Sequence, residues 1–262
     1  MTQKLLIVSG DSFTDRIFRS SAHPLLDCSW RKWPEVLADK LNMKCINLAR
    51  AGQGNEYIYS TLQDTILRIK NKNEIGLVIA AWSQCHRQDF QLGNIFHHPW
   101  KHRGRWHEQR VEANGDLHSW IRRSLRFYNS FEMMCERHNL PYLQTQMIPL
   151  YLDYLRGLPP TEHELVFEGK TFNDALVYPG DKEKDLEDFI QMFLEHEEIL
   201  NTSKFLGWPT IESLGGWSLN REVMGYSDEE IAEIGLVISE QDNHPNKKGH
   251  EKIAEYIYDW LG

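Results

Sequence analysis

Short apolar runs in the first third of the chain alternate with longer segments in which apolar residues recur every three or four positions. The runs at 5–8, 43–49 and 75–82 have the length and composition of buried strands. The segments at 30–41 and 56–71 have the spacing of amphipathic helices. Short turns join them, so this order of strands and helices predicts a parallel sheet with right-handed crossover connections.

Three more elements are predicted in the second half of the chain. Helical spacing returns at 116–139, and a fourth apolar run at 141–147 has the length of a strand. The chain closes with an amphipathic helix predicted at 246–261. The predicted architecture is therefore α/β, with a mostly parallel central sheet.

Two long segments interrupt this alternation. Residues 83–117 are rich in His, Trp, Arg and Gln and are too long for an ordinary connection in an α/β unit. Residues 148–235 contain pieces of helix, such as 185–200, separated by proline and glycine pairs. We expect one domain over residues 1–262, with both segments as insertions, the second one large enough to form a cap.

Composition narrows the class of protein. With 262 residues, of which 41% are apolar, the chain can bury a sizeable core. Its 29 basic against 38 acidic residues give a net charge of −9, which disfavours nucleic acid as a partner. No apolar stretch approaches the roughly 20 residues that span a bilayer, and no signal-peptide pattern is present. Four widely spaced cysteines are typical of reduced thiols. We expect a cytoplasmic protein.

The end of the first predicted strand draws attention to Ser12. The run Leu5–Val8 leads directly into Ser9, Gly10, Asp11 and Ser12. Open α/β sheets build their sites at the carboxyl ends of their strands, where Ser12 would lie. One interpretation is a nucleophile. The other is that glycine supplies a tight turn and that Asp11 or Ser12 caps the next helix.

A serine nucleophile needs a base, and the segment before the last predicted helix offers one. His244 is followed by Pro245, which disfavours helical conformation at His244 and places it in a turn. Asp242 stands two residues earlier and could orient the imidazole ring. Taken alone, the same segment also fits a surface loop.

The two motifs together resemble those of the SGNH (GDSL-type) hydrolases. The matching features are GDSF at 10–13, a glycine with a nearby asparagine after the second strand, and D-x-HPN-x-x-GH at 242–250. The resemblance covers most of the chain outside the two insertions. It implies a three-layer α/β/α, flavodoxin-like fold and no cofactor. It also implies Ser12 as the nucleophile, His244 as the base and Asp242 as the acid that orients the ring.

The resemblance also implies where donors to an oxyanion would lie. The backbone N–H groups of Ser12 and Gly52 match two of the family's donors, with Gly54 as an alternative to Gly52. The family's third donor is an asparagine after the third strand, where this chain has Ser83 and Gln84.

Two departures from the family pattern affect these assignments. The first is the missing asparagine after the third strand, for which Asn55 and Arg87 are alternative substitutes. The second is the position of the acid, which in the family commonly stands three residues before the histidine, where this chain has Gln241. Asp242, two residues before it, remains the candidate.

The insertion at 83–117 contains a histidine cluster between 97 and 107. Its spacing matches no compact metal signature, so no metal is expected. Trp100 and Trp106, with nearby arginines, fit a loop that stacks on sugar rings or reaches an anionic partner. They fit equally well a loop anchored to its own domain or to a second subunit.

Three functional hypotheses follow. The first is a serine esterase acting on a small acyl ester, such as an O-acetylated carbohydrate, with an acyltransferase using the same residues as a variant. The second is a weakly active or inactive binding module with the same fold. The third is a phosphate-binding flavodoxin-like protein, which leaves the segment around His244 unexplained. The expected substrate is a small-molecule or carbohydrate ester. No nucleic acid or membrane partner is expected, and the sequence is compatible with a homo-oligomer.

Overall fold

A five-stranded parallel sheet forms the centre of the fold. The computed structural model describes residues 3–87, 89–92, 95–97, 117–151 and 182–262. The strands lie in the order β2-β1-β3-β6-β7, and every neighbouring pair is parallel. This is the flavodoxin-like order. The bounds are β1 Leu5–Ser9, β2 Lys44–Asn47, β3 Ile75–Trp82, β6 Tyr142–Gln146 and β7 Phe205–Leu206.

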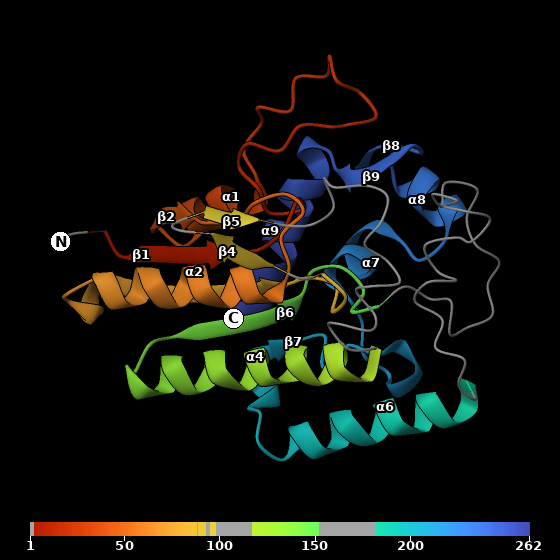
Figure 1. Cartoon of the computed structure of the whole chain (residues 1–262). Helices are drawn as coiled ribbons and strands as arrows, with labels where there is room; N and C mark the ends of the chain where they lie inside the picture. Colours follow the sequence, from red (N-terminus) through yellow and green to blue (C-terminus); the bar gives the residue numbers. More distant parts are fainter. Residues whose placement is uncertain (1–2, 88, 93–94, 98–116, 152–181) are drawn as a thin grey trace.

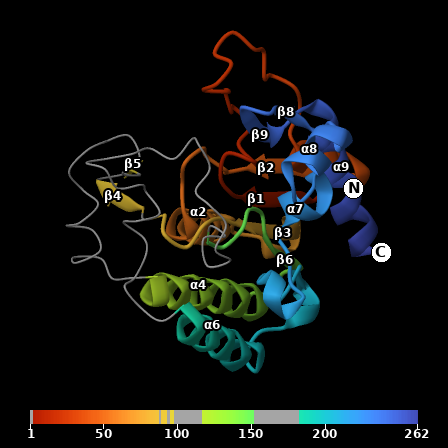
Figure 2. The ribbon, with the colours of Figure 1, turned by 90° about the vertical axis from the view of Figure 1, so that its right-hand side faces the viewer.

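Helices cover both faces of this sheet and complete three layers. One apolar cluster joins the sheet to α2, α4 and α6, and a second joins it to α1, α7 and α9. Figures 1 and 2 show α4 and α6 stacked together on one side of the sheet, with α9 on the other. The bounds are α1 Trp33–Lys40, α2 Asn55–Arg68, α4 Leu117–Arg137, α6 Lys182–Glu197, α7 Leu219–Met224 and α9 Lys247–Leu261.

Alternate residues of the central strands supply the two clusters. In β1, Ile7 belongs to the first cluster, whereas Leu6 and Val8 belong to the second. In β3, Val78 and Ile79 likewise belong to opposite clusters. Because successive side chains of a strand point to opposite faces, a strand buried on both faces needs an unbroken apolar run. The runs at 5–8 and 75–82 meet that requirement, which confirms the predicted α/β architecture.

Smaller elements surround the sheet. The β8–β9 hairpin is antiparallel and leads into α9, whereas β4 and β5 form a separate two-stranded antiparallel sheet. Their bounds are β4 Phe90–Leu92, β5 Ile95–His97, β8 Val237–Ser239 and β9 Asp242–Pro245. The remaining elements are α8 Asp228–Ile234 and the short 3-10 helices η1 Lys72–Glu74, η4 Thr202–Lys204 and η5 Glu212–Leu214.

The segment at 148–235 contributes to the layers of the core, a role that the sequence pattern did not predict. Within it, β7 is the fifth strand of the central sheet, and Phe205 is 3% exposed. The ring of Phe205 meets Tyr128 of α4 edge-on at 5.2 Å between centroids. The two residues of β7 are too short an apolar run to be recognised as a strand from the sequence. Residues 152–181 and most of the histidine cluster, at 98–107, lie outside the described residues.

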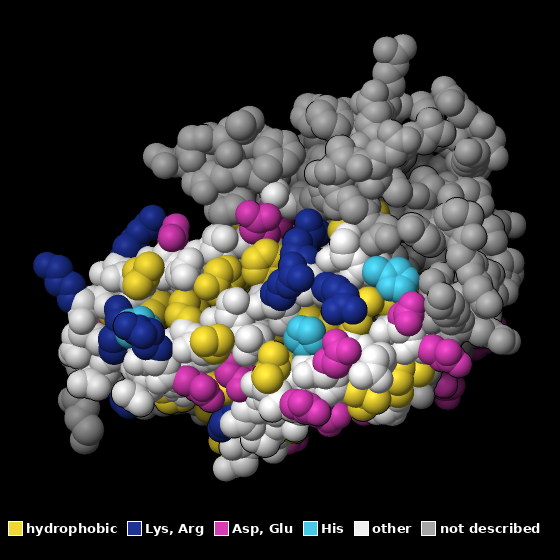
Figure 3. All heavy atoms as spheres, turned by 60° about the horizontal axis from the view of Figure 1, so that its bottom comes forward, with side chains coloured by type: hydrophobic (Ala, Val, Ile, Leu, Met, Phe, Trp, Pro, Cys, Tyr) yellow, Lys and Arg dark blue, Asp and Glu magenta, His cyan; other side chains and the backbone are white. Residues whose placement is uncertain are grey.

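The outer surface of the α4–α6 layer carries charges of both signs. Figure 3 shows basic side chains close to acidic ones on this face, with hydrophobic side chains between them. Arg122 of α4 pairs with Glu195 of α6 at 3.8 Å, and both side chains are about half exposed. Among the described helices, none combines the length and the hydrophobicity needed to cross a bilayer.

We predict that Phe205→Ala lowers the free energy of unfolding by about 3–5 kcal/mol, because it removes a buried ring from the contact between β7 and α4. Urea unfolding measures this loss. The control is Ile199→Ala, a nearby residue with 55% exposure, for which we expect a change within about 0.5 kcal/mol. Equal losses in the two variants would show that β7 is not part of the core.

Candidate active site

The turn after β1 presents Ser12 at the carboxyl end of the sheet. Gly10 makes this turn possible, because a Cβ atom there would lie 2.6 Å from Thr14 Oγ1 and 3.2 Å from the Ala81 Cβ atom. Ser12 itself is half-buried, unlike its neighbours Asp11 and Phe13, which are buried. The glycine thus lets the chain turn tightly against β3 while the serine keeps contact with solvent.

Asp11 fixes this turn to the end of the third strand. Its side chain is fully buried, and Oδ1 accepts the backbone N–H of Phe13 at 3.0 Å. Oδ2 accepts the hydroxyl of Ser83 at 2.9 Å and Arg87 Nη1 at 3.1 Å. A buried carboxylate needs such partners to offset the loss of hydration. The sequence singled out Asp11 only as a helix cap, and its partners come from a segment 72 residues away.

Three side chains predicted from the sequence come together in one hydrogen-bonded chain. The Ser12 Oγ atom lies 2.8 Å from His244 Nε2, and His244 Nδ1 lies 2.6 Å from Asp242 Oδ1. An ionised carboxylate only accepts hydrogen bonds, so the proton between His244 and Asp242 belongs to Nδ1. The lone pair of Nε2 then faces the hydroxyl of Ser12. This is the arrangement that a serine and its general base require.

Asp242 is held in its ionised form. Burial raises the pKa of its carboxyl group, but hydrogen bonds from His244 and Ser20, and the nearby imidazole charge, outweigh burial and lower the pKa to about 2. The backbone N–H of His244 also donates to Oδ1 at 3.1 Å. An ionised Asp242 stabilises a positive imidazole more than a neutral one.

Two aromatic rings restrict the position of the His244 ring. Phe18 stacks on it with 4.2 Å between centroids and an interplanar angle of 28°, and Phe13 lies at 4.6 Å. Both phenylalanines are buried, and the His244 side chain is 23% exposed. The histidine is therefore open to a ligand on part of its surface only.

A loop after Ser12 binds the hairpin that carries His244. The Ser20 hydroxyl donates to Asp242 Oδ2 and accepts the backbone N–H of His23 at 2.9 Å. His23 Nε2 lies 2.6 Å from the Ser239 hydroxyl in β8. Figure 1 shows this loop, in red and orange, beside β8 and β9. Sequence reasoning missed Ser20, because a lone serine in a loop without periodicity carries no signal.

Two of the backbone N–H groups expected from the sequence as oxyanion donors are free in the described structure. Neither Ser12 N–H nor Gly52 N–H donates a hydrogen bond to any of the described residues. Gly52 has φ +80°, a conformation that favours glycine. The alternative, Gly54, donates its N–H to both oxygens of Asp89, at 2.8 and 3.0 Å. Gly52 is thus the better candidate of the two.

The third donor expected after β3 is not available from Ser83. Its hydroxyl donates to Asp11, and its backbone N–H donates to Asn55 Oδ1 at 2.8 Å. Ser83 is fully buried and has no hydrogen left for a ligand. Gln84 is half-buried, and its backbone carbonyl accepts the N–H of Arg87. No described contact links its side chain to Ser12.

Asn55 and Arg87, the alternative donors, hold the site together. Asn55 Nδ2 donates to the Ser83 carbonyl at 3.2 Å and to the Ser124 hydroxyl at 3.0 Å, so Asn55 contacts both backbone groups of Ser83. Arg87 Nη1 donates to Asp11 and to the carbonyl of Gln53, which follows Gly52. These contacts connect the ends of β1 and β3 to the loop that enters α2.

Asp89 closes the first turn of α2 from a distant part of the chain. Besides Gly54 it accepts the N–H of Tyr57 at 2.9 Å, which satisfies donors that a helix start leaves free. Burial raises the pKa of this carboxyl group to about 6, although the two backbone donors act against the rise. A buried acid therefore fixes the end of the Gly52 loop, residues 50–54, where it enters α2.

We predict that Asn55→Asp destabilises the protein by about 2–4 kcal/mol, because a carboxylate oxygen would face the Ser83 carbonyl and the donor to Ser124 would be lost. Chemical unfolding measures the loss. Asn73→Asp, on the exposed 3-10 helix η1, is the matched control and should change stability by less than about 0.5 kcal/mol. Similar stabilities for the two variants would contradict the role assigned to Asn55.

We predict that Asp242 adds acid sensitivity to the fold. Its folded pKa of about 2 lies below the unfolded value, so the unfolded state binds more protons between roughly pH 4 and pH 2. The stability that Asp242 contributes is present above that window and is lost as the pH falls through it. Urea unfolding at stepped pH should therefore show a steeper loss for the wild type than for Asp242→Asn. Parallel curves would contradict the lowered pKa.

Comparisons with known proteins found likeness at the level of solved structures. No family model and no curated protein matches the chain. One similar structure is from Desulfitobacterium hafniense DCB-2, a protein provisionally placed in the G-D-S-L lipolytic family, with 15% identity, a TM-score of 0.49 and coverage of 99% of this chain and 100% of that one.

Two other similar structures are esterases. The psychrotrophic esterase EstA from Pseudoalteromonas sp. has 12% identity and a TM-score of 0.45, with 99% and 97% of the two chains covered. A family two carbohydrate esterase from Cellvibrio japonicus has 15% identity and a TM-score of 0.43, with 99% of this chain and 63% of that one covered. Likeness at this level does not transfer an activity to this chain.

Proposed function

We propose that this protein is a serine ester hydrolase of the SGNH type. The observation that carries the proposal is the hydrogen-bonded chain from Ser12 through His244 to Asp242 at the carboxyl end of the parallel sheet. Serine, imidazole and carboxylate have this order and these distances where a hydroxyl is activated for attack on an acyl group. The motifs at 10–13 and 242–250 resemble those of the same family.

The first half of the reaction forms an acyl-enzyme. Ser12 Oγ attacks the carbonyl carbon of the ester while His244 Nε2 takes the hydroxyl proton. Asp242, ionised and bonded to Nδ1, stabilises the imidazolium that results. His244 then gives the proton to the leaving alkoxide, and the C–O bond of the ester breaks.

Water completes the cycle in the second half. His244 removes a proton from a water molecule, the resulting hydroxide attacks the acyl carbon, and the proton returns to Ser12 Oγ as the acid leaves. The backbone N–H groups of Ser12 and Gly52, which have no acceptor among the described residues, are our candidates for stabilising the oxyanion in both halves. A hydroxyl-bearing acceptor in place of water would make the same residues an acyltransferase.

A small acyl group is the substrate class we favour. His244 is 23% exposed and contacts two phenylalanine rings, so only part of the histidine is open to a substrate. An O-acetylated carbohydrate is one example of such an ester. Trp100 and Trp106, which suggested a sugar, lie outside the described residues.

A second candidate is a binding module with weak or no turnover. The observation in its favour is that Ser83, at the position of the family's third donor, uses both of its hydrogens inside the protein. Losing one oxyanion donor typically lowers turnover by about a hundredfold to a thousandfold. The two candidates differ in whether Ser12 is activated.

We predict that wild-type protein hydrolyses p-nitrophenyl acetate and that Ser12→Ala and His244→Ala each lower kcat by on the order of 10⁴-fold or more, because each removes one member of the hydrogen-bonded chain. Ser203→Ala, an exposed serine outside the site, is the control and should leave kcat unchanged. Each variant's melting temperature reports on folding.

Labelling with a fluorophosphonate separates activation from turnover. A label on the wild type that is absent from Ser12→Ala shows an activated serine even if hydrolysis is slow. If the wild type neither labels nor hydrolyses faster than Ser12→Ala, the hydrolase proposal fails and the binding module takes its place.

A further inference from the structure

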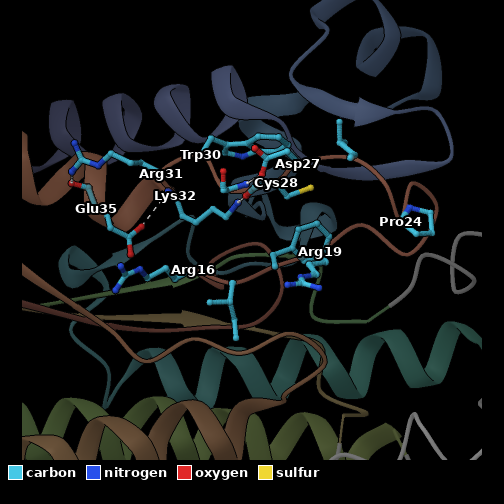
Figure 4. Close-up of a pocket in the computed structure, with 13 residues that line it drawn as sticks. Arg16, Arg19, Pro24, Asp27, Cys28, Trp30, Arg31, Lys32 and Glu35 are labelled. Carbon is cyan, nitrogen blue, oxygen red and sulfur yellow. Dashed lines mark hydrogen bonds between the residues drawn. The ribbon is translucent and has the colours of Figure 1, made fainter.

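A concave site is lined by the loop that follows Ser12. It is a pocket of about 610 Å³, within the size range of small-molecule sites. Figure 4 shows its lining side chains, which come from the loop after β1 and from the start of α1. The proposed reaction leaves this pocket unused.

The lining of the pocket is richer in positive than in negative charge. Four basic side chains line it, against two acidic ones, in a chain whose net charge is −9. The basic residues are Arg16, Arg19, Arg31 and Lys32, and the acidic ones are Asp27 and Glu35. A local excess of cations on an acidic protein concentrates anions at that place.

Two of the arginines have no partner among the residues that the structure describes. Arg16 and Arg19 are exposed and form neither an ion pair nor a side-chain hydrogen bond there. Arg31, in contrast, pairs with Asp39 and donates to the Glu35 carbonyl at 2.6 Å. The guanidinium groups of Arg16 and Arg19 therefore keep all their donors for a ligand.

Lys32 adds a buried cation to the same pocket. Its side chain is 1% exposed, its Nζ donates to the Cys28 carbonyl at 2.6 Å, and it lies 4.7 Å from the centre of the Trp30 ring. A carbonyl and an aromatic ring stabilise an ammonium group without cancelling its charge. Nζ has three hydrogens, and this hydrogen bond uses one of them.

The two carboxylates of the lining are already engaged with the protein. Glu35 accepts the Lys32 backbone N–H at 3.1 Å and Asn47 Nδ2 at 3.1 Å. Asp27 accepts the backbone N–H of Ser29 at 2.9 Å. Neither forms an ion pair with Arg16, Arg19 or Lys32. The two carboxylates keep their charge, but neither lies within ion-pair distance of these three cations.

We propose that this pocket binds a small molecule through a carboxylate or phosphate group held by a guanidinium of its lining, with Arg16 and Arg19 as the two candidates unpaired in the described structure. Arginine forms paired hydrogen bonds with both groups, and the two arginines line the same pocket as the Lys32 charge. Apolar side chains, including Ile17 and Leu26, also line it and would contact the rest of the ligand. The proposal does not depend on hydrolysis at Ser12.

Phe18 connects this pocket to the candidate active site. Its ring stacks on His244 at 4.2 Å between centroids, and the same residue lines the pocket. A ligand in the pocket would therefore contact a residue that packs against the histidine.

Isothermal titration calorimetry with inorganic phosphate and with succinate, in separate titrations at constant ionic strength, tests the proposal. We expect one or both to bind the wild type, and the stronger of the two identifies the preferred group. In the double variant Arg16→Gln/Arg19→Gln the affinity should fall about tenfold or more, because charge-assisted hydrogen bonds are lost. Both arginines are exposed, so the variant should fold normally.

Arg68→Gln/Arg137→Gln is the matched control. It removes the same charge from two exposed arginines in the last turns of α2 and α4, outside the pocket, and should leave the affinity unchanged. An equal loss in the two double variants would mean that only net charge matters, and it would overturn the proposal. Absence of binding of either anion to the wild type would also overturn it.

Discussion

The buried carboxylate of Asp11 is the constraint on which the site depends. It stands between the strand that ends at Ser9 and the half-buried Ser12, and it binds Ser83 and Arg87 from the segment after β3. An unpaired charge in that position would cost several kcal/mol, so the buried turn is stable only with β1 and β3 paired. The position of the serine is thereby linked to the assembly of the sheet. Arg87 carries the same linkage on to the Gly52 loop through the carbonyl of Gln53.

Different parts of the fold hold the serine and the histidine in place. The serine is held from the sheet, through Asp11, Ser83 and Asn55. The histidine is held from the loop after β1, where Phe18 stacks on its ring and Ser20 binds the carboxylate of Asp242. One stretch of about ten residues thus supports both the proposed nucleophile and the proposed base.

Much of this arrangement could be predicted from the sequence, and what could not has a physical reason. The runs at 5–8 and 75–82 predicted buried strands because a strand covered on both faces must be apolar throughout. Ser12 and His244 stood out because a glycine turn and a proline fix the backbone beside them. β7 was missed because two residues carry no period, and Ser20 because its importance comes from a partner 222 residues away. Asn55 was considered only as an oxyanion donor, and nothing in one sequence shows that its amide contacts Ser83 instead.

The distance along the chain between Ser12 and His244 has a consequence for biosynthesis. The two residues are 232 positions apart, and His244 lies in β9, just before α9. During translation the serine leaves the ribosome first, and His244 follows 232 residues later. In the proposed mechanism, the nascent chain therefore carries a serine without its base until β9 has been synthesised and has packed beside it.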